Sequence, residues 1–174
     1  MSALDGETVD ILVNTAGNGG AQRMAMKQFK DMEPSDWDGP IDVNLYGVLN
    51  CTRAVINPMR ERNWGRVITI SSGAGVTGLR IGVSPYAAGK GGAISFMRHL
   101  AAENARAGVT ANSIAIGLMQ PPQSGELESM AAQVPVGRTG QPDDIGFLCV
   151  YLASNEASWM TGQTVHLDGG ATFT

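Results

Sequence analysis

Short runs of apolar, β-branched residues alternate along this chain with longer segments of helical periodicity. The runs lie at residues 9–13, 67–71, 109–116 and 164–167. Between them, apolar residues recur at every third or fourth position, which is typical of amphipathic helices. Parallel strands need long crossover connections of this kind, so the alternation predicts βαβ units and a parallel sheet.

The size and composition of the chain agree with one folded domain. It has 174 residues, of which 43% are hydrophobic, so it can bury a core without disulfides or metals. We predict an α/β fold in which a partial doubly wound, Rossmann-like parallel sheet carries helices on both faces. The single domain is expected to span residues 1–174, and its two longest helices 39–62 and 86–106.

Local signals set the expected ends of the helices. Ser35 offers an N-cap before the first long helix, and Pro58 is expected to kink that helix or end it early. Pro85 opens the second helix at a position that tolerates a missing N–H group. Proline and acids at 141–144 predict the start of a third helix, which ends near Ala153.

The charge pattern and the few histidines and cysteines exclude several functions. A net charge of -4 offers no basic surface for nucleic acid, and no apolar run approaches a membrane-spanning length. His99 and His166 lie far apart without an acidic partner at ligand spacing, so no metal site is predicted. Cys51 and Cys149 are expected to be free thiols, as in a reducing cytoplasm.

A glycine-rich segment at 73–78 matches the spacing G-x-G-x-x-G and follows a strand. A dinucleotide-binding turn of this spacing also needs a helix that begins at its third glycine. Here Gly82, Ser84 and Pro85 come before any helix. We therefore interpret the segment as a plain glycine-rich loop, and phosphate binding at this loop as the alternative.

Tyr86 and Lys90 are spaced four residues apart near the start of a predicted helix. Residues at this spacing share one helix face, and an ammonium group one turn away favours the phenolate form of a tyrosine. Tyr86 is therefore a candidate general acid/base. Because a surface pair with this spacing often arises by chance, the argument also depends on the neighbouring strand ends.

Polar and glycine residues follow the carboxyl ends of three predicted strands, where doubly wound sheets bind their ligands. Asn14 and Gly17 follow the first strand, Ser72 ends the second, and Gly117 follows the third. Asn44 lies among apolar neighbours inside a helix, where an amide is unfavourable unless it is hydrogen-bonded. The sequence therefore predicts one site at this edge of the sheet.

Several ordered motifs resemble the short-chain dehydrogenase/reductase family over essentially the whole chain. They lie at residues 10–17, 43–45, 65–72 and 86–90 and in the tail 137–170. The resemblance implies hydride transfer between NAD or NADP and a carbonyl or an alcohol, in which the cofactor carries the hydride and the protein supplies position and proton.

The roles of individual residues follow from this resemblance. Tyr86 resembles the general acid/base, Lys90 the residue that assists it and binds the nicotinamide ribose, and Ser72 the serine that binds the substrate carbonyl. Asn44 resembles the amide that anchors a water relay behind the lysine. The implied cofactor-binding residues are Asn14, Ala16, Gly17, Tyr86, Lys90, Gly117 and Met119.

The chain also departs from the pattern of the family. Thr15, Ile116 and Pro121 replace the usual asparagine, proline and threonine. The first strand corresponds to the fourth of the family, so about 70–80 upstream residues, with the glycine-rich phosphate loop, are expected to be missing. The chain then corresponds to the C-terminal portion of the family's domain. Without those units, we expect an open sheet edge, poor solubility and only about millimolar cofactor affinity.

The partners follow from the same resemblance. We expect a small-molecule carbonyl or alcohol substrate, and a cytoplasmic homo-oligomer, a dimer or tetramer, that packs through helices 39–62 and 86–106. The alternative is a catalytically inactive remnant that acts as a binding or oligomerisation module. The substrate, the direction of the reaction and the choice between NAD and NADP are not encoded in the motifs that are present.

Overall fold

The computed structural model describes residues 8–17, 26–120 and 127–172. Its strands form one parallel sheet in the order β1-β2-β3-β4, which confirms the predicted topology. The strands are β1 (Ile11–Asn14), β2 (Gly65–Ser72), β3 (Val109–Ile116) and β4 (Thr164–Leu167). Because all of them run the same way, their carboxyl ends meet at one edge of the sheet.

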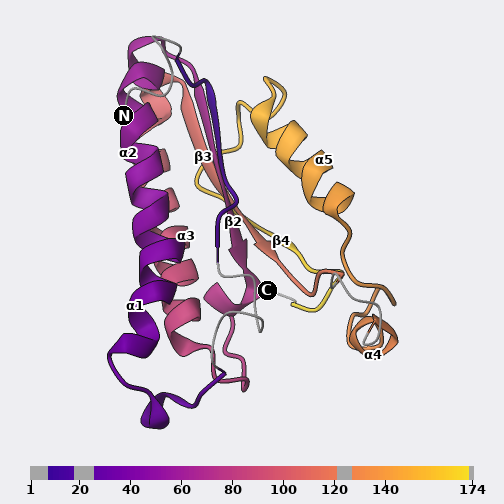
Figure 1. Cartoon of the computed structure of the whole chain (residues 1–174). Coiled ribbons are helices and arrows are strands. Elements are labelled where there is room, and N and C mark those ends of the chain that lie inside the picture. The colour runs from indigo at the N-terminus through magenta and orange to yellow at the C-terminus, as the bar shows by residue number, and fades with distance from the viewer. Residues whose placement is uncertain (1–7, 18–25, 121–126, 173–174) are drawn as a thin grey trace.

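Helices lie on both sides of this sheet, as predicted (Figure 1). One side carries α1 (Ser35–Ile41), α2 (Gly47–Glu61) and α3 (Ser84–Asn104), whereas the other carries α5 (Pro142–Ala153). The shorter α4 (Leu127–Ala131) lies beyond the end of the sheet. Single helical turns are η2 (Phe29–Asp31), η4 (Gly73–Gly75) and η5 (Ala105–Ala107).

Each side of the sheet has its own apolar core. Met59 of α2 and Met97 of α3 pack with Val67 and Val109 of the sheet, and all four are almost completely buried. On the opposite side, Ile68, Ile70 and Ile114 of the sheet pack with Leu152 of α5. Alternate residues of β2 and β3 therefore serve the two cores, as expected for a sheet covered on both faces.

The first long helix differs from its prediction in three ways. Its N-cap is Pro34 rather than Ser35, and the carboxylate of Asp36 accepts a hydrogen bond of 2.8 Å from the backbone N–H of Glu33 instead. The helix continues through Pro58 to Glu61, because packing near its end compensates for one lost backbone bond. Between α1 and α2 the chain forms a π-helical turn, η3 (Asp42–Tyr46).

The first strand, β1, is only partly buried. Ile11 is 44% exposed, and β1 forms one edge of the described sheet, where it pairs with β2 alone. Burial of a parallel strand requires neighbours on both sides and helices above and below it. The described residues give β1 one neighbouring strand and contact with α2. The expected open edge is therefore present.

Candidate active site

The side chain of Lys90 lies inside the protein, between α3, the helix that carries it, and the end of β2. It is only 6% exposed, and its ammonium donates a hydrogen bond of 2.8 Å to the backbone carbonyl of Ile70. Ser71 holds the backbone of the same residue, because its hydroxyl donates to the Lys90 carbonyl at 3.2 Å. Burial lowers the pKa of Lys90 to about 8, since desolvation penalises the charged form.

Asn44 and Gly17 both lie close to the ammonium group of Lys90. The Asn44 amide donates to the carbonyl of Pro40 at 2.9 Å, whereas its oxygen Oδ1 is buried without a hydrogen-bond partner. A Cβ atom added to Gly17 would lie 3.0 Å from both Asn44 Oδ1 and Lys90 Nζ. The loop after β1, the π-helical turn η3 and helix α3 therefore surround one small polar space. Any residue larger than glycine at position 17 would fill this space.

Tyr86 lies one turn before Lys90 in α3, and its side chain is half-buried. The Lys90 ammonium is 5.9 Å from the centre of the Tyr86 ring, so a positive charge is fixed close to the phenol. Ser72 ends β2, and its hydroxyl oxygen accepts a hydrogen bond of 3.2 Å from the N–H of Ala74. The hydroxyl hydrogen of Ser72 is then available for an acceptor outside the protein.

The two remaining segments that the resemblance implies for cofactor binding lie at the carboxyl ends of β1 and β3, on either side of β2. Asn14 is buried at the end of β1, where its amide donates to the hydroxyl of Thr69 at 3.2 Å, and Ala16 is exposed beyond it. Gly117 follows β3, and its N–H donates to the carbonyl of Leu167 at 3.1 Å. Because Ser72 pairs with the residue before Gly117, the two loops begin at the same level.

Met119 lies further along the loop that follows β3. It forms an isolated parallel bridge with Gly140, where an added Cβ would lie 2.6 Å from the Met119 sulfur. This contact fastens the loop to the segment before α5. The loop residues 121–126, which include Pro121, lie outside the described residues.

The glycine-rich loop at 73–78 has the structure predicted for a plain loop. It forms the short turn η4, and the next helix begins only at Ser84. A Cβ at Gly75 would lie 2.8 Å from the backbone nitrogen of Gly91, so this turn packs directly against α3. Its glycine therefore serves the packing of α3 beside Lys90.

Two contributors to the site were missed by the sequence analysis. The carbonyl of Ile70 anchors Lys90, and the hydroxyl of Thr69 holds Asn14; both residues lie inside the motif 65–72, but the resemblance assigned neither of them a role. A backbone carbonyl has no sequence signature. The alternation of Thr69 and Ser71 with isoleucines in β2 is the one signal that indicates a polar face here.

The expectation that His166 has no acidic neighbour is wrong, because its Nδ1 atom lies 3.9 Å from Oδ2 of Asp168. Both atoms are buried without a hydrogen-bond partner. Among residues 8–17, 26–120 and 127–172, no three potential metal ligands cluster.

Comparisons with known proteins place these features in a family. The sequence model described as enoyl-(acyl carrier protein) reductase matches residues 3–172. Acetoacetyl-CoA reductase of Shinella zoogloeoides is 39% identical over 171 residues, which cover 95% of this chain and 68% of the relative. The 3-oxoacyl-(acyl-carrier-protein) reductase FabG of Salmonella typhimurium is also 39% identical, over 93% of this chain and 66% of the relative.

Solved structures agree with these relatives. A 3-oxoacyl-(acyl-carrier-protein) reductase with bound NAD from Brucella melitensis superimposes with a TM-score of 0.88 at 34% identity, over 98% of this chain and 64% of that chain. The chain belongs to the short-chain dehydrogenase/reductase family. It spans about two thirds of the length of the relatives it matches, 68% and 66% in the two cases above.

Membership of the short-chain dehydrogenase/reductase family confirms the predicted class, an NAD(P)-dependent oxidoreductase with a Rossmann-like fold. The comparisons favour this class over the inactive remnant, because the relatives above are named as reductases. Among the described residues, no helix is long and apolar enough to cross a membrane.

The described residues fit one part of a nicotinamide cofactor. The open position at Gly17 and the Lys90 ammonium beside it offer room and a hydrogen-bond donor, as a hydroxyl of a ribose requires. When bound, NAD or NADP supplies the hydride.

Proposed function

We propose that the chain interconverts a small-molecule carbonyl and the corresponding alcohol, with Tyr86 as the general acid/base. The observation that carries this proposal is the buried Lys90 ammonium, which Ile70 holds 5.9 Å from the Tyr86 ring and within reach of Gly17. A structural lysine would not be expected inside the protein without a carboxylate, because burying a charge is unfavourable.

Tyr86, Lys90 and Ser72 each have a separate role in the proposed reaction. The Tyr86 hydroxyl gives its proton to the substrate oxygen during reduction and takes it back during oxidation. Lys90 stabilises the negative charge that this transfer leaves on the phenol. The free hydrogen of the Ser72 hydroxyl orients the substrate oxygen, because the oxygen of Ser72 is already engaged by Ala74.

Asn44 would bind a water molecule of the relay that carries protons behind Lys90. Its unpartnered Oδ1 lies on the same side of Gly17 as the Lys90 ammonium, so a water molecule between them would satisfy both. We propose that the cofactor is lined by residues at or beyond the carboxyl ends of β1 and β3, which lie on either side of β2: Asn14, Ala16, Gly17, Gly117 and Met119.

The names of the relatives suggest a substrate class. Two of them are named for reduction of acetoacetyl-CoA and of 3-oxoacyl groups on acyl carrier protein. We therefore propose a 3-oxoacyl thioester as the first substrate to assay.

The test compares Tyr86→Phe with Tyr46→Phe in the full chain, assayed with acetoacetyl-CoA and millimolar NADH or NADPH. Tyr86→Phe removes only the proton donor, so turnover should fall about 10²-fold or more. Tyr46 lies at the end of η3 and is 53% exposed, so Tyr46→Phe should keep parental turnover. Turnover within a few-fold of the parent in Tyr86→Phe would refute the assignment.

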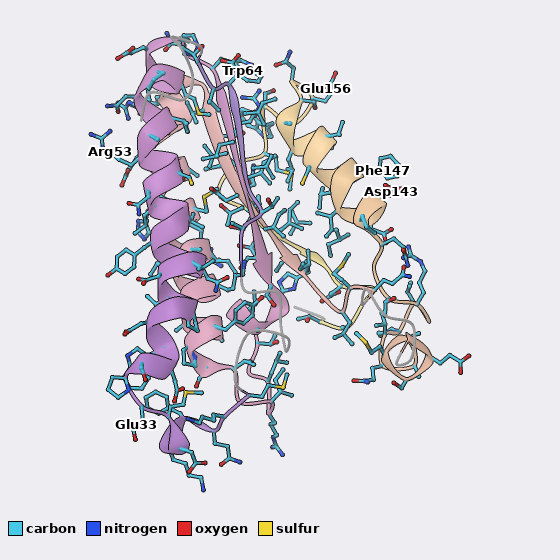
Figure 2. All side chains as sticks on the ribbon, in the orientation of Figure 1. Glu33, Arg53, Trp64, Asp143, Phe147 and Glu156 are labelled. Atoms are coloured by element: carbon cyan, nitrogen blue, oxygen red, sulfur yellow. The ribbon has the colours of Figure 1, made fainter. Side chains whose placement is uncertain are left out.

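We also propose a homo-oligomer, a dimer or tetramer, that packs through the outer surfaces of α2 and α3. Val43 and Tyr46 are 37% and 53% exposed in the turn that precedes α2, and Arg53 projects from α2 away from the sheet (Figure 2). Light scattering should show that Tyr46→Asp has a smaller mass in solution than the parent.

The free thiols Cys51 and Cys149 support a cytoplasmic location.

A further inference from the structure

The segment that follows β4 packs against the start of the loop that follows β3. The two strands run side by side as far as the pair Ile116 and Leu167 (Figure 1). Immediately beyond this pair, the N–H of Gly117 donates to the carbonyl of Leu167 at 3.1 Å. A Cβ added to Gly117 would lie only 2.6 Å from the Cβ of Asp168. Direct contact with Asp168 therefore sets the position of Gly117.

The same segment also reaches the far side of this loop, through the residues that precede α5. The N–H of Val136 donates to the carbonyl of Gly169 at 3.1 Å. Further along, the N–H of Gly140 donates to the carbonyl of Leu118 at 2.9 Å, beside its bridge with Met119. The loop after β3 is therefore held on two sides, and both holds lead back to the turn that Asp168 begins.

The side chain of Asp168 stabilises this turn from inside the protein. It is only 6% exposed, and its Oδ1 atom accepts a hydrogen bond of 3.0 Å from the N–H of Gly170. Gly169 and Gly170 have φ angles of 63° and 85°, a conformation that glycine adopts readily. An aspartate that bonds to the backbone two residues later is a common way to fix such a turn. The carboxylate thus fixes the carbonyl of Gly169 that Val136 requires.

The second carboxylate oxygen of Asp168 lies near His166. Its Oδ2 atom and the Nδ1 atom of His166 are both buried without a hydrogen-bond partner, and they lie 3.9 Å apart. The two atoms are complementary, because a carboxylate only accepts and a neutral imidazole can carry its proton on Nδ1. The distance exceeds that of an N–H···O hydrogen bond by about 1 Å. A small movement of the turn would therefore join them.

Buried polar atoms in proteins are nearly always hydrogen-bonded, so an unpartnered donor and acceptor side by side call for an explanation. We propose that Asp168 is a positioning residue for the nicotinamide end of the cofactor, and that His166 supports it by donating from Nδ1 to Oδ2. Asp168 acts through Gly117 and Gly140, which hold the two sides of the loop. This inference rests on the proposed function, in which Gly117 and Met119 line the cofactor.

The test follows the binding of nicotinamide mononucleotide to the full chain by amide NMR, which observes Gly117 and Met119 directly and measures weak affinities. Asp168→Ala removes both carboxylate oxygens, so the affinity should fall about fivefold or more, as expected for the loss of one buried hydrogen bond. AMP is the half of the cofactor without nicotinamide, and it should leave the Gly117 amide unshifted in the parent and in every variant.

Two further variants distinguish positioning from general stability. Asp168→Asn keeps an acceptor for Gly170 and offers an amide that can bond to His166, so it should restore parental affinity. Thr164→Val is the matched control, because the Thr164 hydroxyl oxygen is also buried without a partner in β4 but lies away from the loop. Its affinity for nicotinamide mononucleotide should equal that of the parent.

His166→Ala tests the pair without changing the turn itself. It should weaken nicotinamide mononucleotide in the same direction as Asp168→Ala. The double variant should bind no more weakly than Asp168→Ala alone, because the effects of two residues in one interaction are not additive. In the parent, the Nδ1–H group of His166 should give a slowly exchanging NMR signal that Asp168→Ala removes.

The outcomes distinguish this role from the proposed reaction. Parental affinity in Asp168→Ala, or an equal loss in Thr164→Val, would overturn the positioning role even if the chain reduces acetoacetyl-CoA. If Asp168→Ala does not fold, parental affinity in His166→Ala would overturn it instead. Amides of Gly117 and Met119 that nicotinamide mononucleotide leaves unshifted would refute both the cofactor lining and the positioning role. Weakening by Asp168→Ala with rescue by Asp168→Asn, in a chain without turnover, would support positioning and refute the catalytic proposal.

Discussion

The helices α3 and α5 cover opposite faces of the same sheet, but they are buried to very different degrees. In α3, nine of 21 residues are buried, including Gly89 and the charged Lys90. In α5, Leu152 alone is buried among 12 residues. Phe147 and Val150 of α5 are 75% and 70% exposed, and Phe147 projects away from the sheet (Figure 2).

This contrast shows that apolar composition by itself does not decide burial. The sequence of α5 is the more hydrophobic of the two, but among the described residues α5 is the one helix that covers its face of the sheet. By contrast, α3 is enclosed by β2, β3, η4 and the α1–η3 segment. A charged side chain can be held in a fixed position only in such an enclosed place, and the candidate site lies there.

The largest expected effect on the free energy of unfolding comes from the buried ammonium group of Lys90. The pKa of Lys90 is about 8 in the folded chain against 10.5 ordinarily, so between these pH values the unfolded state binds more protons. The free energy of unfolding of the parent should therefore rise by up to about 3 kcal/mol from pH 8 to 10.5 relative to Lys90→Met. Below pH 8 the lysine is charged in both states, and the difference should be constant.

Urea unfolding followed by circular dichroism at several pH values measures this difference. Parallel stability curves for the parent and Lys90→Met across the whole range would contradict the burial of the ammonium beneath α3.

The next effect tests how tightly η4 packs on α3. In Gly75→Ala the new methyl group would meet the backbone of Gly91 at 2.8 Å, so the turn or the helix must shift. Overpacking of this kind destabilises a protein by about 1–3 kcal/mol. Gly78→Ala in the same loop is the matched control, because an added Cβ there has no neighbour within 4 Å. Thermal unfolding should separate the two variants; equal midpoints would refute the close packing.

On α5 the same kind of substitution should act in the opposite direction. A Cβ at Gly146 has no neighbour within 4 Å, and the residue lies inside the helix. Alanine is favoured over glycine in a helix interior, so Gly146→Ala should stabilise the chain by about 0.5–1 kcal/mol. A lower midpoint for Gly146→Ala would show that the outer side of α5 is covered in solution.

The smallest effect concerns the exposed start of α5. Asp144 accepts hydrogen bonds from the side chain of Arg138 and from the backbone N–H of Gln141, which together lower its pKa to about 2. Its contribution to stability is therefore present above pH 3.8 and is lost as the pH falls to about 2.

The midpoint of Asp144→Asn should be slightly below that of the parent at pH 7, and the gap should close near pH 2. Asp143→Asn is the control, because Asp143 projects from the helix into solvent (Figure 2). A gap that persists at pH 2 would show that the carboxylate charge is not its cause.

Much of this molecule could be predicted from its sequence because the deciding signals are local. The apolar runs and helical periodicity predicted the four parallel strands, and Gln141–Asp144 predicted the start of α5. The interruption by Gly82, Ser84 and Pro85 correctly predicted that no helix begins at Gly78. The motifs also indicated the family, since their order and spacing are far more specific than any single one.

Tertiary structure alone decided the features that depend on residues far apart in the chain. The burial of Lys90 against Ile70 and the open space that Gly17 shares with Asn44 both require contacts between elements that are far apart in the chain. Sequence periodicity specifies which side of an element is apolar, but not which elements cover it. For that reason the motifs could name the residues of the candidate site, whereas the enclosure of Lys90 between α3 and the sheet could not be predicted from them.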